Sequence, residues 1–297
     1  MKCFYHAADL DGHCSGAIVK YFNPGFTLFP INYGEPFPWD QIEPAEEVVM
    51  VDFSLQPFSQ MIMLNRRSRL VWIDHHKSAM EEFKESGEYI AGSVQVGKAA
   101  CELAWEYFSP GTGMAPRVVR LLGRYDVWDH EDPRVLPFQY GMRLTETDPQ
   151  SDKAMAMWEK FFENDFLCDT VHHDGEVIIR YEAMVSEKYC KSYAFEALMP
   201  THPPNTSCKY HSGRLPAICL NRGMTNSKTF DSRYDPKKHD LMITFCRLPS
   251  ARWTVSLYSD KKNVDCGAIA KRYAGGGHKG AAGFQCEELP FELPFID

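Results

Sequence analysis

Three short, mostly apolar runs near the start of the chain are each followed by a histidine or an aspartate, and this pattern limits the possible folds more than any other. The runs and the polar residues after them are 3–5 with His6, 47–51 with Asp52, and 70–73 with Asp74, His75 and His76. Their length and composition predict buried strands. Because functional side chains in open α/β sheets gather beyond the carboxyl ends of the strands, we expect these residues at one sheet edge.

Two further segments add carboxylates to this set. The first is the loop His6-Ala7-Ala8-Asp9-Leu10-Asp11-Gly12, and the second is a helical pattern over 118–125 that ends at Asp126. A single aspartate at such a position usually makes a turn or caps a helix. Its recurrence at four element ends, together with three histidines, favours a site for Mn²⁺, Fe²⁺ or Zn²⁺, whose ligands include imidazole and carboxylate.

Strand and helix patterns alternate over about the first 130 residues, which predicts a parallel sheet. Two helices follow over 151–198, with a break predicted near 170–175. The break contains His172-His173-Asp174, for which we predict a solvated turn in preference to a second metal cluster. The proline-rich segment 200–206 is typical of a linker.

Shorter strand patterns occupy the last third of the chain. The predicted strands are 217–220, 241–245 and 253–257, and they precede a predicted helix over 264–273. We therefore expect an α/β protein with an N-terminal parallel-sheet domain over 1–198, which includes a linker helix, and a smaller C-terminal α/β domain over 199–297. A cleft between the domains would hold the substrate.

A glycine run follows the last predicted helix and carries two basic side chains. It reads Gly275-Gly276-Gly277-His278-Lys279. Glycines let backbone N–H groups approach a ligand closely, and the histidine and lysine add donors that suit phosphate. A bare run of this kind also fits a flexible turn, and it lacks the spacing of a Rossmann or P-loop motif.

Composition excludes several classes of function. The chain of 297 residues has a net charge of −8, which argues against binding to long nucleic acids, although two divalent metals would add about four positive charges locally. No apolar stretch approaches 18 residues, and the start lacks the apolar region of a signal peptide. Ten cysteines without a Cys-x-x-Cys pair predict reduced, buried thiols in a cytoplasmic protein with no membrane partner.

Taken together, the motifs resemble those of the DHH superfamily of phosphoesterases. The matching pieces are the loop from His6 to Gly12, Asp52 after its strand, Asp74-His75-His76, and Asp126 in Arg-Tyr-Asp-Val-Trp. The segment from Ile269 to Phe284 is similar to the C-terminal domain associated with that superfamily. The pieces span nearly the whole chain and look most like the nano-RNase B type of short-oligoribonucleotide phosphodiesterase.

The resemblance implies a site with two divalent metal ions, usually Mn²⁺. His6 and Asp9 would hold one ion, Asp11 the other, and Asp52 would bridge both. His75 and Asp126 would complete the ligand set. As the catalytic pair, His76 would contact a phosphate oxygen or assist proton transfer, while Asp74 would orient the neighbouring histidine.

The resemblance also assigns the substrate contacts. Gly275, Gly276, Gly277 and His278, with Lys279 beside them, would grip a terminal phosphate or ribose. Many relatives carry an arginine in the strand before the last helix, whereas this chain has Tyr258 in Ser256-Leu257-Tyr258-Ser259. We expect the ring of Tyr258 to stack on a base.

The expected activity is hydrolysis of short oligoribonucleotides to mononucleotides, with short single-stranded RNA or a small phosphorylated nucleotide as the partner. Hydrolysis of cyclic mono- or dinucleotides, of 3′-phosphoadenosine 5′-phosphate or of inorganic polyphosphate fits the same metal ligands. The alternative that is not an enzyme is a metal-dependent sensor, which would bind a nucleotide without hydrolysing it. Long duplexes are not expected as substrates, and a homodimer is left open. Trp72 and Trp128 flank site residues, and we predict that they lie in the core in preference to stacking on a base.

Overall fold

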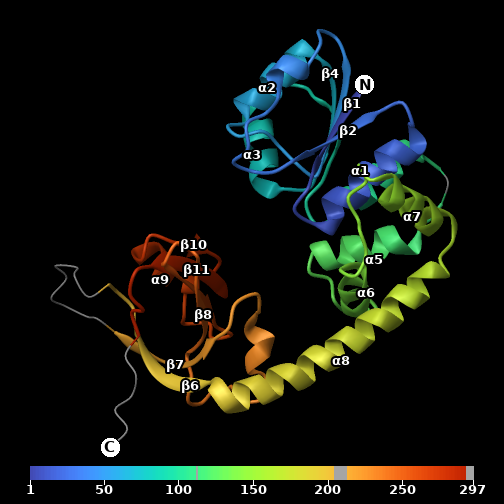
Figure 1. Ribbon diagram of the computed structural model, residues 1–297. Helices are drawn as coiled ribbons and strands as arrows, with labels where there is room; N and C mark the ends of the chain where they lie inside the picture. Colours follow the sequence, from blue (N-terminus) through green and yellow to red (C-terminus); the bar gives the residue numbers. More distant parts are fainter. Residues whose placement is uncertain (112, 204–212, 292–297) are drawn as a thin grey trace, which may run out of the picture. The chain divides into compact units, whose positions relative to one another are not determined.

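The computed structural model describes residues 1–111, 113–203 and 213–291 (Figure 1). The chain divides into two compact units, Met1–Ile179 and Arg180–Asp297. The first unit contains β1 (Lys2–His6), α1 (Leu10–Phe22), β2 (Thr27–Ile31), η1 (Trp39–Gln41), β3 (Glu47–Val51), α2 (Ser59–Arg67), β4 (Arg69–Asp74), α3 (Lys77–Ser86), β5 (Ala91–Val94), α4 (Ala100–Phe108), α5 (Arg117–Asp126), α6 (Val135–Met142) and α7 (Asp152–Glu163). The helix α8 (Leu167–Tyr193) begins in the first unit and ends in the second.

A parallel sheet forms the centre of the first unit. Within the described residues its strand order is β2-β1-β3-β4-β5, and every neighbouring pair is parallel. The chain moves from β1 to β2 on one side and then returns to β3 on the other. Open sheets of this order place their functional sites where the direction reverses, beyond the carboxyl ends of β1 and β3.

Both faces of the sheet are covered by helices, so its strands are apolar on both sides. In β1, Cys3 and Tyr5 pack into a core with side chains of α1, α4, α5 and α7, while Phe4 points to the opposite face. There Phe4 joins a second core with side chains of α2 and α3. This alternation follows from the two-residue period of a strand and fixes which residues reach each face.

The second unit is built on a mixed sheet. Its elements after α8 are β6 (Phe195–Pro200), β7 (Arg214–Asn221), η2 (Ser227–Phe230), β8 (Leu241–Arg247), β9 (Trp253–Tyr258), α9 (Cys266–Arg272), β10 (Gly276–Gly277) and β11 (Ala281–Cys286). The order is β10-β11-β9-β8-β7-β6 within the described residues, and β7 with β8 is the parallel pair. Helix α9 packs on one face, whereas η2 and the end of α8 pack on the other.

The predicted fold class is confirmed: a parallel-sheet unit is followed by a smaller unit of strands and helices. The predicted cleft between the two units stays a prediction. No helix among the described residues is long and apolar enough to cross a membrane. The cysteines that the structure describes are free.

The predicted helix break at 170–175 is wrong. Helix α8 runs through it, and the break lies at 164–166, where the side chain of Asn164 accepts a hydrogen bond from the Phe166 N–H. Gly175 lies inside the helix, where α8 packs closely against α6. A Cβ atom at this position would lie 1.7 Å from the Pro137 carbonyl oxygen of α6, so the close packing explains the glycine. Residues 195–198, expected to be helical, lie in β6, and residues 204–206 of the predicted linker fall outside the described part of the chain.

Candidate metal centre

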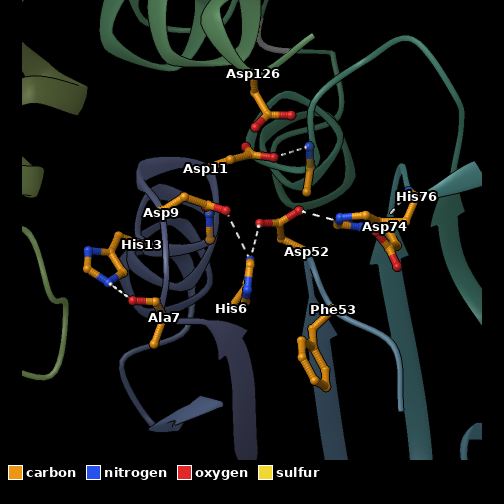
Figure 2. Close-up of polar contacts among 12 residues, drawn as sticks. His6, Ala7, Asp9, Asp11, His13, Asp52, Phe53, Asp74, His76 and Asp126 are labelled. Carbon is orange, nitrogen blue, oxygen red and sulfur yellow. Dashed lines mark hydrogen bonds and ion pairs between the residues drawn. The ribbon is translucent and has the colours of Figure 1, made fainter. Parts of the chain in front are cut away.

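The predicted ligands lie together at the carboxyl edge of the parallel sheet (Figure 2). His6 ends β1, Asp74 ends β4, and Asp52 follows β3 directly. Asp9 and Asp11 come from the start of α1, and Asp126 ends α5. All of them belong to the unit Met1–Ile179.

The loop between β1 and α1 is held in place by Asp9 and Gly12. Asp9 is the N-cap of α1, where its side chain accepts a hydrogen bond of 2.9 Å from the Gly12 N–H. Its second carboxylate oxygen lies 3.0 Å from Nδ1 of His6. A Cβ atom on residue 12 would lie 1.9 Å from the His6 carbonyl oxygen, so only glycine allows α1 to approach β1 this closely.

Asp11 joins the cluster to helix α4. Its carboxylate is almost fully buried and accepts hydrogen bonds from the N–H groups of Ala100, at 2.9 Å, and Cys101, at 2.8 Å. These groups form the start of α4, where a helix favours negative charge. The oxygen bonded to Ala100 also lies 3.6 Å from Nε2 of His75. The contact between residues so distant in sequence fixes the orientation of this carboxylate.

Asp52 has a left-handed backbone conformation, with φ of 55°. Aspartate tolerates this region better than most residues, and the conformation is held by a 2.9 Å hydrogen bond from the Asp52 N–H to the Ile73 carbonyl oxygen. The residue is 1% exposed. Backbone strain of this kind recurs at functional sites.

His75 is surrounded by three carboxylates. Its Nε2 atom lies 3.2 Å from Asp126, 3.3 Å from Asp52 and 3.6 Å from Asp11. The other oxygen of Asp52 lies 3.6 Å from Nδ1 of His6. Asp52 therefore stands between the two histidines and faces each with a different oxygen.

Asp74 organises the turn that carries the two histidines. One of its oxygens accepts hydrogen bonds from the backbone N–H of His75, at 2.7 Å, and of His76, at 3.1 Å. The same oxygen lies 2.7 Å from Nδ1 of His76. Asp74 is fully buried and the side chain of His76 is about one third exposed, so this contact is made on the buried side of the His76 ring.

The electrostatics of the cluster show an excess of buried negative charge. Burial, and then the charges of Asp52 and Asp126, raise the pKa of Asp11 well above its usual value. Burial also raises the pKa of Asp126 to about 6 despite the opposing effect of His75. Burial alone would lower the pKa of His6, but Asp52 and Asp9 raise it to about 10.

These residues fit divalent cations. Three overlapping groups bring possible ligand atoms close together: His6 with Asp9 and Asp52, Asp52 with His75 and His76, and Asp11 with His75 and Asp126. Within the described part of the chain, Nδ1 of His6 and one oxygen of Asp52 are buried, and their close approaches to neighbouring carboxylates and imidazoles lack hydrogen-bond geometry. Unsatisfied buried groups of this kind are costly, and imidazole nitrogen with carboxylate oxygen suits a transition-metal ion.

No protein-family model matches the chain. The sequence is 24% identical over 266 residues to an uncharacterized protein of Acanthamoeba polyphaga mimivirus. The matched region covers 84% of this chain and 55% of the viral protein. This chain thus spans about half the length of that relative.

A solved structure shares the fold of this chain. A pGpG-specific phosphodiesterase from Vibrio cholerae is 12% identical, with a TM-score of 0.53 over 96% of this chain and 92% of the other. An exopolyphosphatase-related protein from Bacteroides fragilis is 13% identical, with a TM-score of 0.44 over 97% and 87% of the two chains. At these identities the first likeness establishes the fold alone.

The predicted substrate contacts lie in the second unit, and their role stays a prediction. Gly276 and Gly277 form β10, which pairs with β11, and the His278 N–H donates to the Ala281 carbonyl oxygen at 2.7 Å. The run is therefore part of a hairpin. Gly275 lines a cavity of about 400 Å³ with Arg252. Tyr258 is half-buried, and its hydroxyl donates to the Thr225 carbonyl oxygen.

Sequence inspection assigned one aromatic residue near the cluster wrongly to the core and did not single out another. Trp128, predicted to be core, is 84% exposed, whereas Trp72 is buried as expected. Tyr33 lies just beyond β2, half-exposed, with its ring centroid 5.6 Å from that of His6 and 4.3 Å from that of Phe53. Sequence inspection did not identify β2, the strand before Tyr33, because it contains Pro30 and proline is rare in strands except at sheet edges.

Proposed function

We propose that the chain is a metal-dependent phosphodiesterase of the DHH type that hydrolyses short oligoribonucleotides to mononucleotides. The observation that carries the proposal is the position of Asp52, which faces His6 with one oxygen and His75 with the other. A carboxylate between two sets of ligands is what a bridged pair of metal ions requires.

In the proposal, His6, Asp9 and Asp52 hold one divalent ion, probed most simply with Mn²⁺. Asp11, Asp52, His75 and Asp126 hold a second. When bound, the ions supply a nucleophilic hydroxide near neutral pH and stabilise charge on the phosphate. Two divalent ions carry as much positive charge as the four carboxylates carry negative charge. They would offset both the burial and the repulsion that raise the pKa of Asp11.

The remaining side chains orient and donate. Asp74 fixes the ring of His76 through Nδ1, which directs Nε2 of His76 toward a phosphate oxygen or a leaving group. Two exposed rings, those of Tyr33 and Trp128, support a nucleotide as substrate. Tyr33 packs on the buried ring of Phe53, and Figure 2 shows Phe53 and Asp126 on different sides of Asp52. Trp128 follows Asp126 by two residues. Neither inorganic polyphosphate nor a bare phosphate would use such surfaces.

The test is a panel of 5′-phosphorylated diribonucleotide, cyclic dinucleotide, 3′-phosphoadenosine 5′-phosphate and polyphosphate, each with Mn²⁺, Mg²⁺ or Co²⁺. We expect the linear dinucleotide to have the highest kcat/KM, and His75→Ala to lower it by at least about a hundredfold, since ligand loss typically costs that much or more.

The matched control for His75→Ala is His173→Ala. His173 is an exposed residue of α8, outside the cluster, so its replacement should leave turnover unchanged. A higher kcat/KM for polyphosphate than for the dinucleotide would show that the proposed substrate class is wrong. If the protein bound a nucleotide tightly but formed no product during a long incubation, it would be a sensor, and the proposed enzymatic activity would be refuted.

Metal binding should raise thermal stability. Because the ions bind the folded cluster and not the separated residues, Mn²⁺ at about a hundred times its Kd should add about 2.7 kcal/mol per site. For a chain of this size the Tm should rise by on the order of 5 °C or more in differential scanning fluorimetry, and EDTA should reverse the change. An identical Tm with Mn²⁺ and with EDTA would exclude the proposed metal centre.

A further inference from the structure

Trp128 is placed where an exposed aromatic ring is unusual. It is 84% exposed, although tryptophan is among the residues that gain most from burial. Its backbone has φ of 61°, in the left-handed region. Just past the end of a helix this conformation favours glycine, and a bulky side chain there is strained. Folding therefore gains little from tryptophan at this position.

The backbone holds Trp128 firmly despite that strain. The Trp128 N–H donates to the Tyr125 carbonyl oxygen at 3.2 Å, and the Asp129 N–H donates to the Arg124 carbonyl oxygen at 2.9 Å. An ion pair of 3.5 Å between the side chains of Arg124 and Asp129 closes the same turn. The indole is thus presented to solvent by an ordered turn.

Two neighbouring rings support the indole. The ring centroid of His130 lies 5.6 Å from that of Trp128 and 5.3 Å from that of Tyr125, with planes 32° and 23° apart. The His130 ring is therefore close to both of the other rings. These three aromatic side chains form one aromatic surface, in which Trp128 and His130 are exposed and Tyr125 is half-buried.

This surface lies next to the candidate metal centre. Trp128 follows Asp126 by two residues, so their Cα atoms are at most about 7 Å apart. The carboxylate of Asp126 lies 3.2 Å from Nε2 of His75. A ligand whose phosphate sits at the cluster would carry its sugar and base within reach of the indole.

From these observations we infer that Trp128, supported by His130, is a stacking platform for a nucleobase of the substrate. The inference rests on the proposed function and assigns a residue that determines specificity for nucleotides over other phosphorylated compounds. Base stacking on an aromatic side chain tolerates any base, because every base has a π face. The preformed turn lowers the cost of ordering the ring on binding.

The experiment measures binding of AMP and of ribose 5-phosphate, which share sugar and phosphate but differ in the base. Trp128→Gly should weaken AMP binding about tenfold or more, as measured by equilibrium dialysis in the presence of Mn²⁺, and should leave ribose 5-phosphate binding unchanged. Trp128→Tyr keeps a ring and should restore most of the affinity. In the wild type, AMP should quench tryptophan fluorescence, and Trp128→Gly should abolish the quenching.

Misfolding does not confuse this test, because glycine suits the left-handed backbone at 128 and should not lower the Tm. Tyr89→Ala, which removes another highly exposed ring of the same unit, should bind AMP like the wild type. AMP affinity within twofold of the wild type, an equal loss for ribose 5-phosphate, or a changed oligomeric state with unchanged AMP affinity would each overturn the platform. If AMP binding depended on Trp128 but no substrate were hydrolysed, the proposed enzymatic activity would be refuted, whereas the stacking role of Trp128 would be supported.

Discussion

Asp52→Asn should lower kcat/KM for a 5′-phosphorylated diribonucleotide by at least about a thousandfold, or more than about 4 kcal/mol of transition-state stabilisation. The expected loss is large because Asp52 faces both His6 and His75, so one substitution removes a charged ligand from both proposed ions. Steady-state hydrolysis with Mn²⁺ measures the effect.

Asparagine is the informative replacement at this position. It is nearly isosteric with aspartate and tolerates the left-handed backbone that Asp52 adopts, whereas alanine would add strain. The Tm of the metal-free variant should therefore stay close to that of the wild type, while the rise on adding Mn²⁺ should shrink. Asp40→Asn, an exposed change in η1, should alter neither quantity. Turnover within tenfold of the wild type in Asp52→Asn would refute the bridging role.

Gly12→Ala should disrupt the centre without touching a ligand. The added Cβ would lie 1.9 Å from the carbonyl oxygen of His6 and 2.8 Å from its Cβ, so either His6 or α1 must move. We expect overpacking to cost about 1–3 kcal/mol, to lower the Tm by several degrees, and to weaken Mn²⁺ binding at least about tenfold. Scanning fluorimetry and titration with Mn²⁺ measure the two effects.

Gly213→Ala is the matched control, because a Cβ there would meet its nearest neighbour at 3.6 Å and the residue is exposed. This variant should match the wild type in both measurements. If Gly12→Ala bound Mn²⁺ as tightly as the wild type, the close approach of α1 and β1 would not be what positions His6.

The strand ends were predictable because their cause is local. The runs before His6, Asp52 and Asp74 are apolar on both faces, as strands between two helical layers must be, and a polar residue can appear only where the layers end. The meeting of these ends at one edge follows from the parallel sheet. Sequence inspection therefore found the residues that form the candidate centre, although their roles as ligands are proposals.

Features that depend on contacts distant in sequence were not predictable in the same way. Gly175 looked like a helix breaker because the Pro137 carbonyl that requires it lies in another helix. Trp128 looked like core because tryptophan usually is, and only the backbone conformation after α5 turns it outward. Nothing near Asp11 in sequence indicates that it accepts hydrogen bonds from Ala100 and Cys101.

The hydrogen bonds from Ala100 and Cys101 mean that the Asp11 carboxylate has two sets of partners. The same carboxylate faces His75 and anchors the first turn of α4, so the strength with which it can serve a cation depends on how firmly those backbone N–H groups hold it. In the proposed centre, changes in packing along α4 would therefore alter the metal affinity while every proposed ligand stays in place. A protein engineer seeking a weaker or tighter centre would begin with that helix.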